Sequence, residues 1–346
     1  MTFYKRFLSR FSKDIGIDLG TANTVVYVRG EGIVLREPSV VAMNTHTKEV
    51  LAIGEEAYRM VGRTPGNLVA VRPLKDGVIA NFDITESMVH AFIKKAVRHY
   101  RFSKPRILIG VPWGITDVEK RAVLDAALKA GAGETLLIDE PMAAAVGAHI
   151  DVCAAEGSMV IDIGGGTTEV AVISLGGIVV CKSSRVAGDE FDESIITHCR
   201  KNYNLLIGER MAERIKINIG SAYPFEEDKT MEVSGRDLLS GLPKTFTMSS
   251  YEIRDALSDP VSTIIQSVRL ALEKTPPELS SDIMQKGIYM TGGGSLLHGL
   301  VENIMGETEI PIKRADDPLS CVAIGTGKIL ESNMIENVSG TISRRF

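Results

Sequence analysis

Two segments of the chain share one layout: an apolar stretch ends in an aspartate, a turn of small residues follows, and a β-branched stretch comes next. In residues 159–173 the aspartate is Asp162, and in residues 15–28 it is Asp18. Each segment predicts a two-stranded hairpin, although a tight hairpin that merely needs glycine explains either copy alone. Small residues also let successive backbone N–H groups approach an anion closely. Both turns are therefore candidate phosphate cradles.

The repetition of this layout favours a phosphate cradle over a simple tight turn. The distance between the copies is too long for a solenoid repeat and suits a duplicated domain. Two facing hairpins of this kind would clamp the phosphates of a nucleotide. Because an acid beside a phosphate cradle needs a cation between them, we interpret Asp162 as a holder of Mg²⁺ through water.

Composition narrows the class of protein. The 346 residues suffice for two domains, and 44% hydrophobic with 24% charged residues is ordinary for a globular chain. A net charge of −5 without a basic tract argues against a general nucleic-acid binder. The four cysteines form no CxxC motif, which argues against zinc and suits a reducing cytosol. No apolar run reaches the roughly 18–20 residues that cross a bilayer.

Residues 1–13 predict a short amphipathic helix with an apolar face and a basic face. Such a helix is marginal alone in water but suits the interface of an anionic membrane. The alternative is a helix that packs on its own domain. The aromatic loop at residues 100–102 is a second membrane candidate, for which packing on the core is the favoured interpretation. The residues expected to enter the membrane are Phe3, Phe7, Leu8 and Phe11.

Strands and helices alternate between residues 106 and 148, which predicts a mainly parallel sheet covered on both faces. A capping box formed by Thr116 and Glu119 begins one of the helices. Ligands in such folds lie at the carboxyl ends of strands, and Glu140 follows one of these ends. Its carboxylate could orient an attacking water. A helix-start acid favoured by the helix dipole is an equally supported alternative.

A third glycine turn follows a short predicted strand at residues 287–290 and precedes a predicted helix at residues 296–305. A strand, a glycine turn and a helix start together form a site for an anion or the edge of a ring. A triple glycine has weak specificity alone, but here it is the third such element in one chain.

These elements together resemble the actin, Hsp70 and sugar-kinase superfamily, and within it most closely the MreB family of bacterial actins. The resemblance covers essentially the whole chain. The segments that carry it are IDLGTANT (17–24), RPLKDGVIA (72–80), IDEPMAAA (138–145), residues 162–170, AERIK (212–216) and TPPEL (275–279).

The resemblance implies an α/β fold of two RNase-H-like domains, each with a smaller subdomain, around one nucleotide cleft. Domain I would span residues 14–154, with its small subdomain at about 42–74. Domain II would span residues 155–322, with its small subdomain at about 189–247. Residues 323–346 would form a C-terminal helix that returns to domain I, followed by a loose tail.

The resemblance also implies a site for ATP and Mg²⁺. Asp18 and Asp162 would hold the metal through water, while Glu140 and Thr167 would handle the attacking water. Val25 stands where actins carry a phosphate-contacting lysine, so Mg²⁺ and backbone N–H groups would balance the phosphate charge. The expected nucleotide contacts are the first phosphate turn (Thr21, Ala22, Asn23), the second (Gly164, Gly165, Gly166, Thr167), the adenosine helix (Glu213, Arg214, Ile215, Lys216) and the turn beside the adenine and α-phosphate (Gly292, Gly293, Gly294, Ser295).

The implied function is that of a slow ATPase coupled to a cytoskeletal filament. The filament would pair antiparallel protofilaments on the inner face of the cell membrane, organise cell-wall elongation and maintain rod shape. Its partners would be other copies of itself, the membrane surface and cell-wall elongation proteins, with no nucleic acid. One alternative is a small-molecule kinase, which needs a second substrate pocket with a proton-accepting acid that we cannot identify. The other is a chaperone-type ATPase, which normally needs a further substrate-binding domain.

Overall fold

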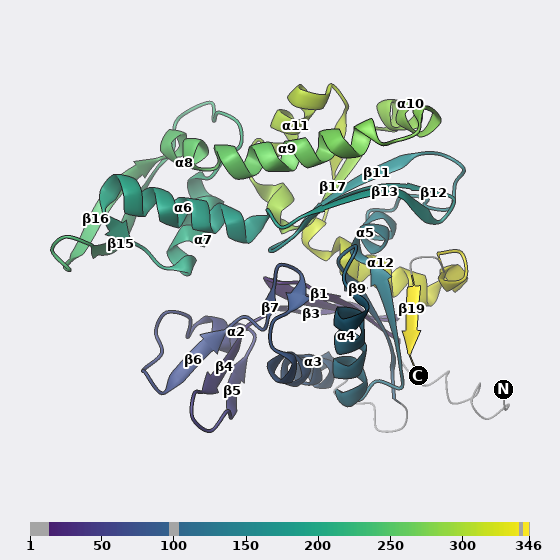
Figure 1. Ribbon diagram of the computed structural model, residues 1–346, viewed down its shortest axis with the longest axis horizontal. Helices are drawn as coiled ribbons and strands as arrows, with labels where there is room; N and C mark the ends of the chain where they lie inside the picture. Colours follow the sequence, from purple (N-terminus) through teal and green to yellow (C-terminus); the bar gives the residue numbers. More distant parts are fainter. Residues whose placement is uncertain (1–13, 97–103, 339–341, 346) are drawn as a thin grey trace.

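The computed structural model describes residues 14–96, 104–338 and 342–345. Two mixed sheets, each covered by helices, form the lower and upper halves of the molecule in Figure 1. The lower sheet has the strand order β19 (Ile342–Arg345), β10 (Glu134–Asp139), β9 (Arg106–Val111), β1 (Ile15–Leu19), β2 (Asn23–Val28) and β3 (Gly32–Pro38). The upper sheet has the order β13 (Gly177–Ser184), β12 (Thr168–Ser174), β11 (Ser158–Ile163), β17 (Ile288–Thr291) and β18 (Ile312–Arg314).

The two sheets share one layout, in which a three-stranded antiparallel meander continues into parallel strands. In the lower sheet β1 pairs antiparallel with β2 and parallel with β9. In the upper sheet β11 pairs antiparallel with β12 and parallel with β17. The duplicated sequence pattern therefore corresponds to a duplicated sheet. Both hairpin turns follow the carboxyl end of the first strand of their meander.

Two helices fill the space between the sheets. They are α5 (Glu140–Gly147) and α12 (Cys321–Glu331). Every residue of α5 is buried, and every residue after Glu140 is apolar, as expected for a helix enclosed on all sides. Its side chains share one apolar cluster with Leu136 of the lower sheet and Val160 of the upper sheet. The outer faces are covered by α3 (Phe82–Ala96) and α4 (Asp117–Lys129) below, and by α9 (Ser258–Glu273), α10 (Pro277–Lys286) and α11 (Leu300–Thr308) above.

Two small three-stranded sheets lie at the left of Figure 1, one on each domain. The lower one contains β5 (Val50–Ile53), β4 (Val41–Asn44) and β6 (Leu68–Val71), with helix α2 (Glu55–Tyr58) beside them. The upper one contains β14 (Leu205–Leu206), β15 (Thr230–Asp237) and β16 (Pro243–Ser249), packed on α6 (Gly188–Tyr203), α7 (Glu209–Ile219) and α8 (Ser250–Ala256).

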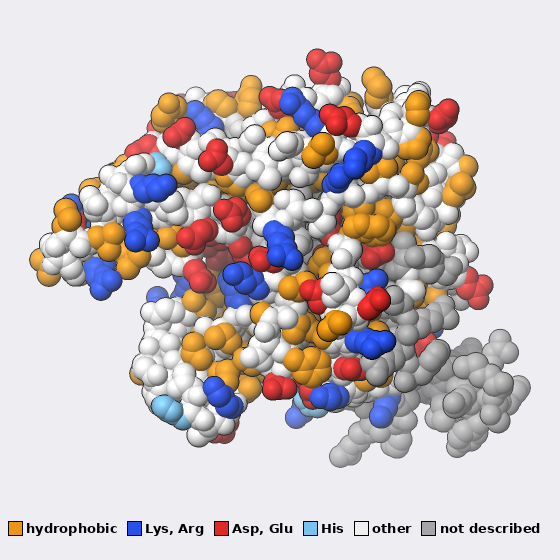
Figure 2. All heavy atoms as spheres, viewed as in Figure 1, with side chains coloured by type: hydrophobic (Ala, Val, Ile, Leu, Met, Phe, Trp, Pro, Cys, Tyr) orange, Lys and Arg blue, Asp and Glu red, His pale blue; other side chains and the backbone are white. Residues whose placement is uncertain are grey.

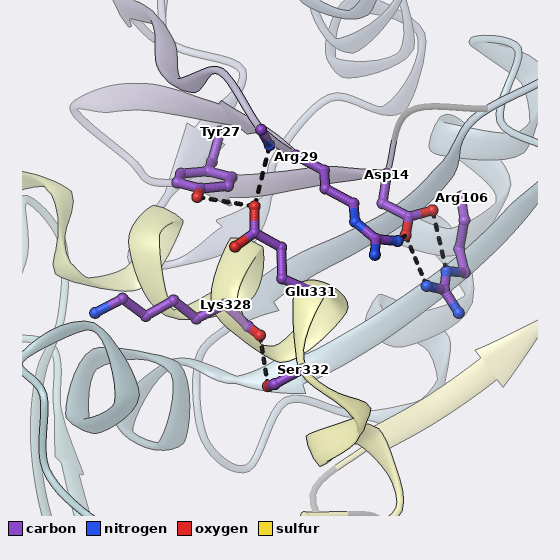
Figure 3. Close-up of polar contacts among 8 residues, drawn as sticks. Asp14, Tyr27, Arg29, Arg106, Lys328, Glu331 and Ser332 are labelled. Carbon is purple, nitrogen blue, oxygen red and sulfur yellow. Dashed lines mark hydrogen bonds and ion pairs between the residues drawn. The ribbon is translucent and has the colours of Figure 1, made fainter. Parts of the chain in front are cut away.

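Polar contacts attach the end of α12 and the start of β1 to the lower domain (Figure 3). The Tyr27 hydroxyl donates to Glu331 at 3.1 Å. Asp14 accepts hydrogen bonds from Arg29 at 3.2 Å and from Arg106 at 2.7 Å. These two arginines therefore fix the chain directly before β1.

The structure differs from the expected pattern at two places. Residues 342–345 were expected in a loose tail but form β19, which pairs antiparallel with β10. Edge pairing uses backbone N–H and C=O groups, so the polar side-chain pattern gives no sign of it. After β17 the glycine turn forms a short 3₁₀ turn, η1 (Gly293–Leu296), and α11 begins only at Leu300. The capping box of Thr116 and Glu119 on α4 is confirmed.

The membrane predictions fall on segments outside the described residues. Phe3, Phe7, Leu8, Phe11 and the loop 100–102 all lie outside the described residues. Within the described part of the chain, none of the helices combines the length and the apolar character needed to traverse a bilayer.

The contact between α5 and α12 requires glycine on both helices. A Cβ on Gly147 would lie 1.8 Å from the Cys321 carbonyl oxygen, and a Cβ on Gly325 would lie 1.8 Å from that of Ala143. Both obstacles are backbone atoms, so a side-chain rotation cannot relieve the clash. The two helices that join the domains are thus packed at backbone distance.

We predict that Gly147→Ala lowers the free energy of unfolding by at least about 1–3 kcal/mol, the usual cost of overpacking a core. Urea unfolding followed by circular dichroism measures the change. The matched control is Gly306→Ala on α11, where an added Cβ meets nothing within 4 Å and alanine favours the helix. Equal stability of the two variants would contradict the close packing of α5 on α12.

Candidate functional site

A cavity of about 570 Å³ lies between the domains, where β1 and β11 end. It is lined by both hairpin turns, the third glycine turn and part of α7. The predicted site residues that line it are Asp18, Thr21, Ala22, Asn23, Glu140, Asp162, Gly164, Gly165, Gly166, Thr167, Glu213, Lys216, Gly292, Gly293 and Gly294.

Three predicted contact residues do not line the cavity. Ile215 and Ser295 are both fully buried; Ile215 belongs to the core of the upper domain, and the Ser295 hydroxyl donates to the Gly292 carbonyl at 2.6 Å. Arg214 is exposed on α7. Successive side chains on a helix point about 100° apart, so only one face of α7 can reach the cavity.

The two hairpin turns touch each other directly. A Cβ on Gly165 would lie 2.7 Å from the Cβ of Ala22, and a Cβ on Gly166 would lie 3.0 Å from the backbone nitrogen of Asp76. The Thr21 hydroxyl accepts a hydrogen bond from the Gly77 N–H at 3.0 Å. The glycines are therefore needed for the approach of one turn to the other, as well as for any approach to an anion.

The N-terminus of α6 is attached to the second turn. The Asp189 N–H donates to the Gly165 carbonyl at 2.8 Å, and the Gly188 N–H donates to the Gly164 carbonyl at 3.2 Å. Lys216 of α7 fixes the same helix, because its ammonium donates to the Gly188 carbonyl at 2.9 Å. Lys216 also forms an ion pair of 2.8 Å with Asp192 of α6. Lys216 thus has two protein partners and joins α6 to α7.

Buried carboxyl groups gather behind the turns. Burial, together with the charge of Asp162, raises the pKa of Asp18 to about 8. Burial raises the pKa of Asp162 to about 6, although a hydrogen bond of 2.9 Å from the Thr291 hydroxyl opposes this rise. The pKa of Glu140 lies well above its usual range because of burial and the neighbouring charges of Glu169, Asp18 and Asp162.

A cation would stabilise the ionised form of these groups. Carboxylate oxygens are the ligands that Mg²⁺ prefers, and this ion usually keeps several of its waters. Asp18 and Asp162 at the ends of β1 and β11 fit such an ion. Across the described residues, no three His, Cys, Asp or Glu side chains come close enough to hold a metal directly. The water-mediated mode predicted from the sequence does not need such a cluster.

Glu140 and Thr167 face the cavity from opposite domains. Glu140 is the first residue of α5, directly after the parallel strand β10 of the lower sheet, and is 9% exposed. Thr167 ends the second hairpin turn of the upper domain and is also 9% exposed. Both side chains are thus largely buried and line the same cavity.

Several lining residues escaped the sequence analysis. The rings of Phe225 and His298 stack at 3.9 Å between centroids, and the Lys229 ammonium lies 4.2 Å from the Phe225 centroid. Arg72 and the helix start at Gly188 also line the cavity. A glycine before an acidic amphipathic segment marks the start of α6 and could have indicated Gly188. No local pattern links Phe225 to His298, because they meet only in the folded chain.

Two meander-plus-parallel sheets that enclose one cleft define the class of actin-like ATPase folds. A family model described as MreB/Mbl protein matches residues 12–337 of this chain. The chain therefore belongs to the MreB/Mbl family, which confirms both the predicted fold and the predicted family of cell-shape proteins.

Curated relatives agree with this assignment over nearly the whole chain. The cell shape-determining protein MreB of Escherichia coli (strain K12) is 55% identical over 332 residues, which cover 94% of this chain and 96% of the relative. The cell shape-determining protein Mbl of Bacillus subtilis (strain 168) is 51% identical over 322 residues, which cover 93% and 97%.

Solved structures give the same fold. The crystal structure of MreB5 of Spiroplasma citri bound to AMPPNP matches with a TM-score of 0.89 and 40% identity, covering 95% of this chain and 98% of that one. The MamK double helical filament matches with a TM-score of 0.80 and 21% identity, covering 93% and 99%. At that identity the MamK likeness concerns the fold alone.

Glu169 of β12 is a buried carboxyl group that the sequence analysis did not single out. It is 1% exposed and accepts a hydrogen bond of 2.6 Å from the Trp113 N–H of the lower domain. Its other oxygen, Oε2, has no partner among the described residues. Burial raises the pKa of Glu169 from its ordinary 4.5 to about 8, against a lowering by the Trp113 hydrogen bond.

We predict that Glu169→Gln changes how stability depends on pH. The raised pKa means that the folded protein keeps a proton that the unfolded chain releases above about pH 4.5. This contribution to stability is complete at lower pH and is lost as the pH rises through about 8. Between about pH 6 and about pH 9 in EDTA, the Tm of the variant should therefore rise relative to the parent.

Differential scanning fluorimetry measures both Tm values across this pH series. The absolute Tm of the variant also reflects the new amide group, so the pH-dependent change in the Tm difference carries the result. The control is Glu190→Gln, an exposed carboxyl group on α6. A Tm difference for Glu169→Gln that stays constant with pH would disprove the retention of the proton.

Proposed function

We propose that this chain binds ATP with Mg²⁺ between its two hairpin turns and assembles into filaments that act in determining cell shape. The observation that carries the proposal is the direct contact of the turns at Gly165 and Ala22, with the carboxyl groups of Asp18 and Asp162 behind them. A cavity with this lining offers backbone N–H groups on one side and cation ligands on the other. The structures of S. citri MreB5 bound to AMPPNP and to ADP support nucleotide binding.

The proposed residue roles follow the position of each side chain. The turns 20–23 and 164–167 would hold the phosphates, with Asp18 and Asp162 orienting Mg²⁺ through water. Bound Mg²⁺ would balance phosphate charge that no lysine balances at Val25. Glu213 on α7 would contact the adenosine. We place domain I at residues 14–154 and domain II at residues 155–322, and residues 323–346 would return to domain I. A bound nucleotide would thus bridge the two domains.

For hydrolysis we assign Glu140 and Thr167 to the attacking water. Glu140 would accept or orient a water proton from the lower domain, while the Thr167 hydroxyl would fix the water from the upper domain. Both side chains line the cavity, and a carboxylate at the end of β10 is placed as ligand-facing groups are in open α/β sheets. Turnover would be slow, since position 25, where actins carry a phosphate-contacting lysine, is a valine.

Filament formation and membrane attachment complete the proposal. The filament would consist of paired protofilaments of this chain, lie in the cytoplasm against the inner face of the cell membrane and organise cell-wall elongation proteins. The amphipathic sequence of residues 1–13 supports the membrane contact. Sedimentation with Mg·ATP, with and without anionic liposomes, tests this function. A filament protein should pellet with Mg·ATP alone, without a kinase substrate or an unfolded client protein. Pelleting under these conditions would distinguish the proposed filament from the kinase and chaperone alternatives.

We predict opposite defects for two variants of the cavity. Asp162→Asn keeps a partner for the Thr291 hydroxyl but removes the charge, so the affinity for ATP should no longer increase when Mg²⁺ replaces EDTA. Glu140→Gln should bind Mg·ATP normally but hydrolyse it about 10²-fold more slowly, the usual scale of acid–base assistance. Calorimetry and phosphate release measure the two quantities.

The control for both is Asp282→Asn, which changes a carboxylate that accepts the Gly157 N–H at 2.7 Å and does not line the cavity. This variant should bind and hydrolyse ATP as the parent does. Unchanged Mg²⁺ dependence in Asp162→Asn would refute the metal assignment. A normal rate in Glu140→Gln would leave Glu140 only its role in starting α5.

We predict that deletion of residues 1–13 releases filaments from anionic liposomes without changing ATP affinity. Burying one large apolar side chain contributes roughly 1.5–3 kcal/mol, and each basic residue adds about 1 kcal/mol at an anionic surface. Ordering the segment costs about 1–2 kcal/mol per residue, so a single chain should bind weakly. A filament presents many copies and should bind firmly.

Liposome flotation measures this attachment. The double variant Phe7→Ser and Phe11→Ser keeps every basic residue and should lose flotation as the deletion does. Flotation of either variant at the parental level would place attachment elsewhere, with residues 100–102 the next candidate.

A further inference from the structure

The small subdomains of the two domains meet across the outer end of the cavity. Helix α2 of the lower domain and helix α7 of the upper domain lie on facing sides in Figure 1. The Tyr58 hydroxyl at the end of α2 donates a hydrogen bond to Glu213 Oε2 on α7. Arg72 and Glu209 form a longer ion pair of 3.9 Å between the same two subdomains. Figure 2 shows acidic and basic side chains gathered along the line where the domains face each other.

Arg210 of α7 fixes the ring that makes this contact. Its guanidinium carbon lies 5.1 Å from the centroid of Tyr58, a distance typical of a cation–π contact. The Nη1 of Arg210 is buried and has no hydrogen-bond partner among the described residues. Burial and the Glu213 contact raise the pKa of Tyr58 to about 12, so its hydroxyl remains a donor at neutral pH. The ring is thus oriented by one residue of α7 and bonded to another.

Glu213 connects this contact to the cavity. Its side chain lines the cavity, and its second oxygen, Oε1, has no hydrogen-bond partner among the described residues. A carboxylate with one oxygen fixed by a phenol can offer the other to a ligand hydroxyl in a defined direction. Vicinal hydroxyls of a ribose are donors of this kind, whereas a deoxygenated sugar offers none.

We propose that Tyr58 is a positioning residue of the nucleotide site: it orients the Glu213 carboxylate toward the ribose hydroxyls and, through the same bond, closes the outer end of the cleft. This inference rests on the nucleotide-binding function proposed above. The hydroxyl contact with Glu213 and the cation–π contact with Arg210 both join the lower domain to α7, so opening the cleft must break the Tyr58–Glu213 bond. Ribose recognition and domain closure then depend on one hydroxyl.

The test compares Tyr58→Phe with the parent protein, using ATP and 2′,3′-dideoxy-ATP, both with excess Mg²⁺. A hydrogen bond to a charged group supports a preference of about tenfold. Tyr58→Phe should bind ATP about tenfold more weakly, whereas its affinity for the dideoxy nucleotide should fall much less, by only the share that domain closure contributes. Release of etheno-ADP, which is labelled on the base and leaves the ribose free, should be faster from the variant.

The matched control is Tyr203→Phe. The Tyr203 hydroxyl donates to Glu252 within the upper domain, and neither residue lines the cavity. This variant loses the same chemical contact but no contact between domains, so both affinities and the release rate should match the parent. In a double-mutant cycle, Tyr58→Phe should add little to Glu213→Gln, because the two residues act as one unit.

Three other outcomes are possible, and each would contradict a different part of the proposal. Equal weakening of both nucleotides would mean that Tyr58 does not act through the ribose hydroxyls. Unchanged ATP affinity, or additive effects with Glu213→Gln, would remove the positioning role altogether. A parent protein that binds neither nucleotide would instead overturn the proposed nucleotide site itself.

Discussion

The rest of the structure depends on the backbone contact between the two hairpin turns. Ala22 and Gly165 come from different domains, yet an added Cβ on the glycine would lie 2.7 Å from the alanine methyl group. Only glycine allows this approach. The contact sets the distance between the carboxyl ends of β1 and β11, and so brings Asp162 close enough for its charge to raise the pKa of Asp18. The same contact leaves the N–H groups of both turns beside one cavity.

A second backbone contact lies deeper in the molecule. Helices α5 and α12 touch at Gly147 and Gly325, and α5 is enclosed by side chains of both sheets. With the domains joined at this depth and again at the turns, the outer subdomains are connected mainly by side chains. Tyr58, Arg72 and their partners on α7 are of this kind. Side-chain contacts open at lower cost than backbone packing, so motion between domains should concentrate at the outer end of the cavity.

Much of this arrangement follows from sequence pattern. The repeated aspartate and small-residue turn predicted two equivalent hairpins, and strand–helix alternation placed Glu140 at a strand end. The sequence pattern does not predict which side chains of a motif face the cavity, or which distant segments meet in the fold. The AERIK motif consists of consecutive residues, but these point in different directions on a helix. Ile215 therefore lies in the core, while Glu213 lines the cavity. Contacts such as Phe225 with His298, or Tyr58 with Glu213, join distant segments and leave no local periodicity. Strand β19 forms through backbone groups that the side-chain pattern does not report.

Charge explains why the proposed nucleotide would bind to such a cleft together with a cation. Phosphates bring negative charge to a place where carboxyl groups already raise one another's pKa. Val25 supplies no cation, and Lys216 is paired with Asp192. Ionising the buried acids without a counter-ion costs free energy, and protonation avoids that cost in the metal-free protein. Binding of Mg²⁺ would therefore be coupled to release of protons from Asp18 and Asp162. Burial disfavours the ionised acids, so the proposed binding of metal and nucleotide together would be much more favourable than the binding of either one alone.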